Sequence, residues 1–163
     1  MSEVVRLLTG ATDGTGSAQA RCLELAEPLQ ARLEELAGAV YPREACGLLV
    51  GFLSTVSVRV CAVHPARNLS DAQNRFDIDP GEVVRIDREA RAEGLEICGV
   101  WHSHPDRPAV PSAVDLGTSW SLVPHVIVSV EEGVSTAIRV WRIGPDRTSL
   151  ELDLVGHARA PRK

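Results

Sequence analysis

Apolar residues recur along this chain at two spacings, one typical of helices and the other of strands. From Glu27 onward they stand three or four positions apart, which predicts an amphipathic helix that Pro42 ends. Its apolar stripe consists of Leu29, Leu33, Leu36, Ala37 and Val40. A second helix is predicted to begin near Pro80 and to stop at Gly94. The apolar residues of this second helix are Val83, Val84, Ile86 and Ala90.

Short apolar runs predict the strands. Runs at 46–53 and 56–63, separated by a short Ser-Thr turn, predict a buried hairpin. A strongly apolar strand is expected at 95–101, with two histidines at or just beyond its C-terminal end. Three further strands are predicted at 126–130, 136–143 and 150–154. With 163 residues and 44% hydrophobic content, the chain fits one α/β domain with a central mixed β-sheet flanked by helices.

The two ends of the chain differ from this core. Residues 9–17 are small and polar and can bury little surface, so we expect residues 1–25 to form a flexible N-terminal extension. The domain is then predicted at 26–156, followed by a C-terminal tail at 157–163. No apolar stretch reaches the roughly 18 to 20 residues that span a bilayer, so no membrane partner is expected.

Charge and cysteine usage narrow the range of partners further. The net charge is −5 and the basic residues are scattered, which argues against a nucleic-acid partner. Lys163 is the only lysine, and we interpret this bias toward arginine as a sign of a bacterial source. The four cysteines form no Cys-x-x-Cys pair, and three lie in apolar segments, which favours reduced thiols and a cytoplasmic protein.

Two histidines directly after the strand predicted at 95–101 carry the strongest chemical signal. Side chains alternate along a strand, so His102 and His104 point to the same side and can bind one ion. An isolated His-x-His is more often a pair of surface histidines. Here three prolines stiffen the following loop, and an ionisable pair beside a buried strand is costly unless something binds it. Asp115 is the natural third ligand for zinc.

Ser112 and Asp115 also have a purely structural interpretation, since their spacing resembles a capping box at the start of a short helix. The two interpretations are compatible, because residues one turn apart share a face of a helix. Hydrolysis would further need a general base. Spacing alone leaves that role open among five glutamates. These are Glu44, Glu82, Glu89, Glu93 and Glu96.

Taken together, these residues resemble the JAMM, or MPN-plus, zinc metallopeptidase family. That family has an upstream Glu, then His-x-His-Pro, then a Ser after seven intervening residues, and an Asp three further on. The resemblance runs from about Glu27 to Leu154, and the segment 42–51 resembles the family's upstream Glu segment, which implies Glu44 as the base. It also implies a cytidine-deaminase-like architecture.

Each motif position of the family carries an implied role. His102, His104 and Asp115 would bind one Zn²⁺ per chain, with water as the fourth ligand. Glu44 would take a proton from that water and return it to the leaving amine, while Ser112 would help to hold the developing oxyanion.

The resemblance also implies a substrate. Short stand-alone bacterial members look like processing enzymes for ubiquitin-like β-grasp sulfur-carrier proteins. They would hydrolyse the amide bond after the carrier's C-terminal Gly-Gly, releasing cysteine or a short extension. One alternative is a deubiquitinase-like isopeptidase acting on ubiquitin-like protein–lysine conjugates, and another is a non-catalytic MPN-type binding scaffold. The sequence does not distinguish a monomer from a homodimer.

Two other zinc families fit less well. A bacterial family associated with DNA repair genes shares the His-x-His-Pro and Ser-x-x-Asp core. Its members usually carry an added helical DNA-binding region, for which this sequence shows no candidate. Zinc deaminases need His-x-Glu and Pro-Cys-x-x-Cys, and neither motif occurs.

Overall fold

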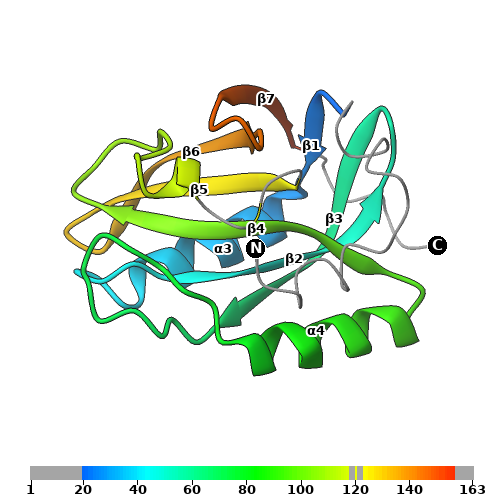
Figure 1. The fold of residues 1–163 in the computed structure, drawn as a ribbon, viewed down its shortest axis with the longest axis horizontal. Helices are drawn as coiled ribbons and strands as arrows, with labels where there is room; N and C mark the ends of the chain where they lie inside the picture. The colour runs from blue at the N-terminus through cyan, green and yellow to red at the C-terminus, as the bar shows by residue number, and fades with distance from the viewer. Residues whose placement is uncertain (1–19, 118–119, 121–122, 157–163) are drawn as a thin grey trace.

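Seven strands of the described chain form one sheet that closes on itself (Figure 1). The structure is a computed structural model and describes residues 20–117, 120 and 123–156. The strands are β1 (Cys22–Glu24), β2 (Cys46–Leu53), β3 (Ser57–Ala66), β4 (Glu96–Pro105), β5 (Pro124–Glu131), β6 (Val134–Ile143) and β7 (Ser149–Val155). Their order is β1-β3-β2-β4-β5-β6-β7, and β7 pairs back onto β1. Pairs β1–β3, β1–β7 and β4–β5 are parallel and the others antiparallel, so the predicted mixed sheet is confirmed, whereas its closure was not predicted.

The helices α3 (Glu27–Gly38) and α4 (Pro80–Ala92) pack against different faces of the strands. In the view of Figure 1, α3 lies behind the sheet and α4 runs below it. Leu33 of α3 belongs to one buried cluster with Leu49 of β2, while Ile86 of α4 belongs to another with Leu48. Successive side chains of a strand point to opposite faces, so β2 is buried on both sides. This explains its near-continuous apolar run.

Both predicted helices are present, with small differences at their apolar stripes. For α4, the side chain of Asp79 accepts a hydrogen bond from the Gly81 amide at 2.8 Å, and Pro80 occupies the first turn. Val84 is 53% exposed because it is adjacent to the buried Val83, and neighbours on a helix cannot share one face. Val40 lies beyond the end of α3 and is also exposed. Neither described helix has the length and apolar character needed to cross a membrane.

The strand β1 lies inside the segment predicted as an N-terminal extension. Leu23 is fully buried between Val58 of β3 and Leu154 of β7, and Leu25 is buried as well. The folded unit therefore includes residues before the predicted boundary at 26. A three-residue strand is too short to show an alternating pattern, which is why its signal was missed. The rest of the predicted extension, 1–19, and the tail, 157–163, lie outside the described residues.

The strand β4 extends four residues beyond the strand predicted at 95–101 and takes in both histidines. His102 pairs with Cys46 of β2 on one side and with Ile127 of β5 on the other, and His104 pairs with Ser129 of β5. The neighbouring strands therefore hold this polar stretch in the sheet. Their ladders fix the backbone of both histidines.

Gly47 occupies a point where three strands meet. A Cβ at this position would overlap the carbonyl oxygen of His64 and stand 2.5 Å from Nε1 of Trp101. That Nε1 already donates a hydrogen bond to the same carbonyl at 3.2 Å, so neither group can withdraw easily. We expect Gly47→Ala to lower the free energy of unfolding by about 2 to 3 kcal/mol, measured by urea denaturation.

A matched control for this variant is Gly156→Ala, because a Cβ at Gly156 meets nothing within 4 Å. Its free energy of unfolding should stay within about 0.5 kcal/mol of the wild type. Equal stability of the two variants would contradict the close contact at Gly47.

Candidate active site

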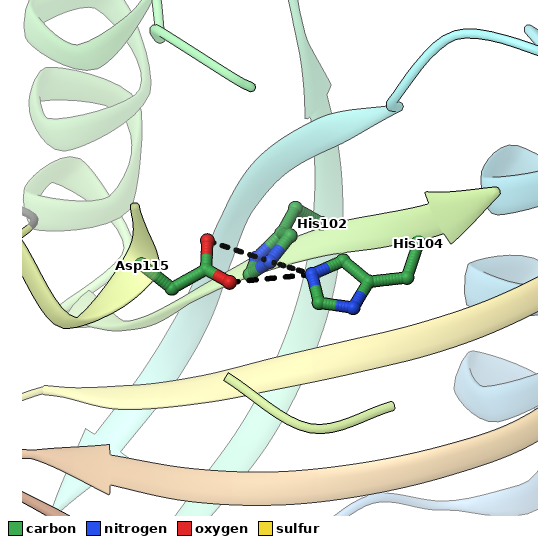
Figure 2. A group of neighbouring side chains, drawn as sticks. All are labelled: His102, His104 and Asp115. Atoms are coloured by element: carbon green, nitrogen blue, oxygen red, sulfur yellow. Dashed lines mark hydrogen bonds and ion pairs between the residues drawn. The ribbon is translucent and has the colours of Figure 1, made fainter. Parts of the chain in front are cut away.

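His102, His104 and Asp115 converge on one point, as Figure 2 shows. The two Nε2 atoms lie 3.1 Å apart. Nε2 of His102 lies 3.2 Å from Oδ1 of Asp115, and Nε2 of His104 lies 3.3 Å from Oδ2. All three side chains are buried, and they are the predicted ligands. The structure thus brings together a group that could hold a metal ion.

The hydrogen bonds of this group suit a metal. Nδ1 of His104 lies 2.8 Å from the carbonyl oxygen of Pro108. A carbonyl can only accept, so Nδ1 carries the proton and a neutral ring keeps its Nε2 lone pair for a ligand bond. The ring of His102 stacks on Phe76 at 4.4 Å, and burial lowers the pKa of His102, which favours the neutral ring. Two imidazoles and a carboxylate are a donor set that Zn²⁺ takes.

Ser112 holds Asp115 in place. Its amide and its hydroxyl both donate to Oδ2 of Asp115, at 2.7 and 2.6 Å, and the Asp115 amide donates back to the hydroxyl oxygen at 3.2 Å. This reciprocal pattern is the predicted capping interaction, although the helix is a short 3-10 turn, η1 (Asp115–Gly117), rather than one that begins at Ser112. The capping and ligand interpretations are therefore compatible in one residue pair.

Asp115 is held as a carboxylate. Burial raises its pKa, but the close contacts with His102 and His104 and the hydrogen bonds from Ser112 outweigh burial, and the pKa of Asp115 lies well below its usual range. An ionised carboxylate is the form that binds a cation.

Glu44 reaches the same site through strand register. Cys46 pairs with His102. The residue before Cys46, Ala45, donates its amide to the Ser103 hydroxyl at 2.8 Å, and its carbonyl accepts from the Ser103 amide at 2.9 Å. Continuing this antiparallel register places Glu44 opposite His104, on the same face. Burial raises the pKa of the Glu44 carboxyl to about 7, with His104 and Arg107 opposing the rise.

The other four glutamates considered from the sequence lie elsewhere. Glu82 and Glu89 are on α4 and pair with Arg85, and Glu93 and Glu96 are exposed. Glu44 is the buried member of the five, at 3% exposure. Burial therefore distinguishes Glu44 from the other four, and its role as the base stays a prediction.

Arg107 is a site residue that the sequence did not reveal. Its Nη2 donates to Oε1 of Glu44, from a loop 63 residues away along the chain. Its side chain is 32% exposed, whereas the Glu44 side chain is 2% exposed. No local pattern links the two residues, because an arginine in a polar loop is ordinarily solvated. Only the three-dimensional arrangement brings them together.

A hollow borders the ligand group. This cavity of about 250 Å³ has Asp115 in its wall. Its lining residues are Arg75, Phe76, Asp77, Val114, Asp115, Gly117 and Trp120. The cavity gives a substrate room to approach the group.

Three other buried residues, His125, Cys46 and Trp101, stay out of this group. His125 is buried with Nε2 2.8 Å from the carbonyl oxygen of Trp120, and burial lowers its pKa to about 4. Cys46 is a buried free thiol whose pKa burial raises to about 12. Trp101 joins the cluster around Leu33, on the face opposite His102.

Comparisons with known proteins agree with this geometry. The chain is 34% identical over 90 residues to a protein named desampylase from Haloferax volcanii, and 30% identical over 91 residues to a probable TtuB-protein conjugate cleaving protease from Thermus thermophilus. These stretches cover 54% and 55% of this chain but only 63% and 58% of the two relatives. The chain thus spans less than two thirds of either relative.

Structural similarity extends over more of the chain. The solution structure of protein DSY2949 from Desulfitobacterium hafniense has a TM-score of 0.75 and 28% identity, and the match covers 84% of this chain and 94% of that one. Residues 26–144 match the family model for prokaryotic homologs of the JAB domain. The chain therefore belongs to this JAB family.

Proposed function

We propose that this protein is a zinc-dependent metallopeptidase that hydrolyses amide bonds at the C-terminus of ubiquitin-like proteins. The observation that carries the proposal is the buried Glu44 carboxyl, which interacts electrostatically with His104 and Asp115, two members of the group of two histidines and an aspartate. Buried ionisable groups with displaced pKa values are typical of catalytic sites. The relative named as a conjugate cleaving protease supports the same chemistry.

His102, His104 and Asp115 would hold the Zn²⁺. When bound, Zn²⁺ polarises a carbonyl and lowers the pKa of water, so that hydrolysis can proceed near neutral pH. The protein itself contributes three buried donor side chains that are already close together. The two histidines are fixed by strand pairing and Asp115 by its bonds to Ser112.

Glu44 moves the proton. It accepts one from the attacking water, whose oxygen adds to the carbonyl carbon of the scissile amide. It then delivers that proton to the nitrogen as the C–N bond breaks, giving a carboxyl group and a free amine. A pKa of about 7 suits a group that must both accept and donate near neutral pH.

Ser112 is the proposed oxyanion donor. In the free protein its hydroxyl donates to Asp115, so serving the oxyanion requires the hydroxyl proton to turn away from that carboxylate. The Ser112 amide also donates to the same oxygen, which keeps Asp115 positioned while the hydroxyl turns.

The specific bond is the finer part of the proposal. We place it after the C-terminal Gly-Gly of a ubiquitin-like β-grasp sulfur carrier, with cysteine or a short extension as the leaving group, in a cytidine-deaminase-like domain. Cleavage of lysine conjugates is the alternative that the name of the Thermus relative favours. A non-catalytic scaffold is disfavoured because the three candidate ligands form one buried group and a buried carboxyl, Glu44, interacts with two of them.

The test is hydrolysis of a sulfur-carrier protein from the same source, extended by a cysteine after its Gly-Gly, with and without Zn²⁺. We expect release of cysteine that stops on chelation and returns on adding Zn²⁺, followed by mass spectrometry of the carrier. A carrier joined to a lysine side chain, assayed in parallel, separates the two substrates. No zinc-dependent cleavage of either would sink the proposal.

A further inference from the structure

Arg107 places a positive charge beside the proposed base. Its Nη2 donates to Oε1 of Glu44, and the Arg107 side chain is partly exposed while that of Glu44 is buried. A guanidinium has five N–H donors. The remaining donors of Arg107 form no hydrogen bond with another described residue. Arg107 is thus a partly exposed, charged neighbour of Glu44 with donors left for a further partner.

The backbone around Arg107 is firmly anchored. The Asp106 amide donates to the carbonyl oxygen of Val130 at 2.8 Å, and the Ser129 hydroxyl donates to the Arg107 carbonyl at 2.6 Å. The next carbonyl, that of Pro108, accepts from His104. These bonds fix the position from which the side chain extends. Arg107 can therefore change partner by rotating its side chain alone.

The position of Glu44 indicates which part of a substrate Arg107 would meet. A proton donor lies about 3 Å from the atom that it protonates, so the leaving nitrogen lies beside the Glu44 carboxyl. If that nitrogen belongs to a single amino acid, its free α-carboxylate is only two bonds away. The carboxylate then falls within reach of the guanidinium that already contacts Glu44. Arginine binds carboxylates through paired, charge-assisted hydrogen bonds.

We propose that Arg107 is a specificity residue that binds the free α-carboxylate of the leaving amino acid, which makes the enzyme favour removal of one terminal residue over cleavage of a lysine conjugate. This inference rests on the proposed function. In the free protein the Glu44 carboxylate is the acceptor that Arg107 binds in place of the substrate carboxylate. Substrate binding transfers Arg107 to the carboxylate and releases the base. A lysine side chain offers no carboxylate near its amine and leaves the pair of Arg107 and Glu44 intact.

The experiment compares three forms of the same carrier with the zinc-loaded enzyme. One ends in Gly-Gly-Cys with a free carboxylate, one ends in the corresponding cysteine amide, and one is joined through Gly-Gly to a lysine side chain. We expect wild-type kcat/KM to be about tenfold or more higher for the carboxylate form, since a hydrogen bond to a charged group contributes roughly that much. In Arg107→Gln this ratio should fall close to one, and Arg107→Lys should restore part of it.

Binding gives a readout separate from turnover. With chelated protein, the carboxylate form should bind more tightly than the amide form to the wild type but not to Arg107→Gln. Arg32→Gln, an equal charge change on the exposed surface of α3, should keep the wild-type ratio. A wild-type ratio near one, or an equal loss on both forms in Arg107→Gln, would overturn the role of Arg107 while leaving the hydrolase intact. If the wild type cleaves none of the three forms, the proposed function itself fails.

Discussion

Glu44→Gln is expected to lower kcat by about a thousandfold while the protein keeps its fold and its metal. General acid–base catalysis typically raises the reaction rate by a factor of roughly 10² to 10⁴. The Gln amide fills the same space and can still accept the hydrogen bond from Arg107. It cannot take a proton from water or return one to an amine. The loss should therefore appear in kcat, measured with the carrier substrate, with zinc content near one per chain.

Glu82→Gln is the matched control for this variant. Glu82 lies on α4, paired with Arg85 and away from the ligand group, so its replacement should leave kcat unchanged. If Glu44→Gln retained activity within tenfold of the wild type, the proton would have to travel through another group, and the assigned role of Glu44 would be wrong.

His104→Ala is expected to abolish both metal binding and activity. The substitution removes one of three donors and leaves the Pro108 carbonyl without its imidazole partner. A vacated buried side chain also costs packing, and we expect a loss of about 2 to 4 kcal/mol in the free energy of unfolding of the chelated protein. Zinc content should fall from near one per chain to a small fraction, measured by elemental analysis after dialysis.

The histidine at position 64 provides a comparison. His64 lies on β3 outside the ligand group, and its backbone carbonyl, which alanine retains, is the part that bonds Trp101. His64→Ala should keep stoichiometric zinc. Equal zinc content in both variants would mean that His104 is not a ligand.

Much of the fold could be read from local patterns. The start of α4 was predictable because proline at its first turn and a carboxylate before it are local signals of a helix start. The hairpin of β2 and β3 was predictable from two apolar runs around a short turn. The pairing of the two histidines was predictable for a similar reason, since the alternation of a strand alone puts His102 and His104 on one face.

The features that were missed depend on contacts distant in sequence. Closure of the sheet rests on β1, whose three residues pair with β3 and β7 and carry too little pattern of their own. The contact between Arg107 and Glu44 joins a loop to the segment just before β2 across 63 residues. Glu44 itself could be chosen only through the family resemblance. Its burial depends on the register of β2 with β4, which composition does not reveal.

The position of β1 has a consequence for synthesis on the ribosome. This strand leaves the ribosome before the other described strands, yet one of its two partners, β7, is the last of them to emerge. Every residue of the candidate site, from Glu44 to Asp115, is translated before β7. Domains generally fold as units. The sheet can therefore close only after the chain has been translated through Val155, well after the last residue of the candidate site.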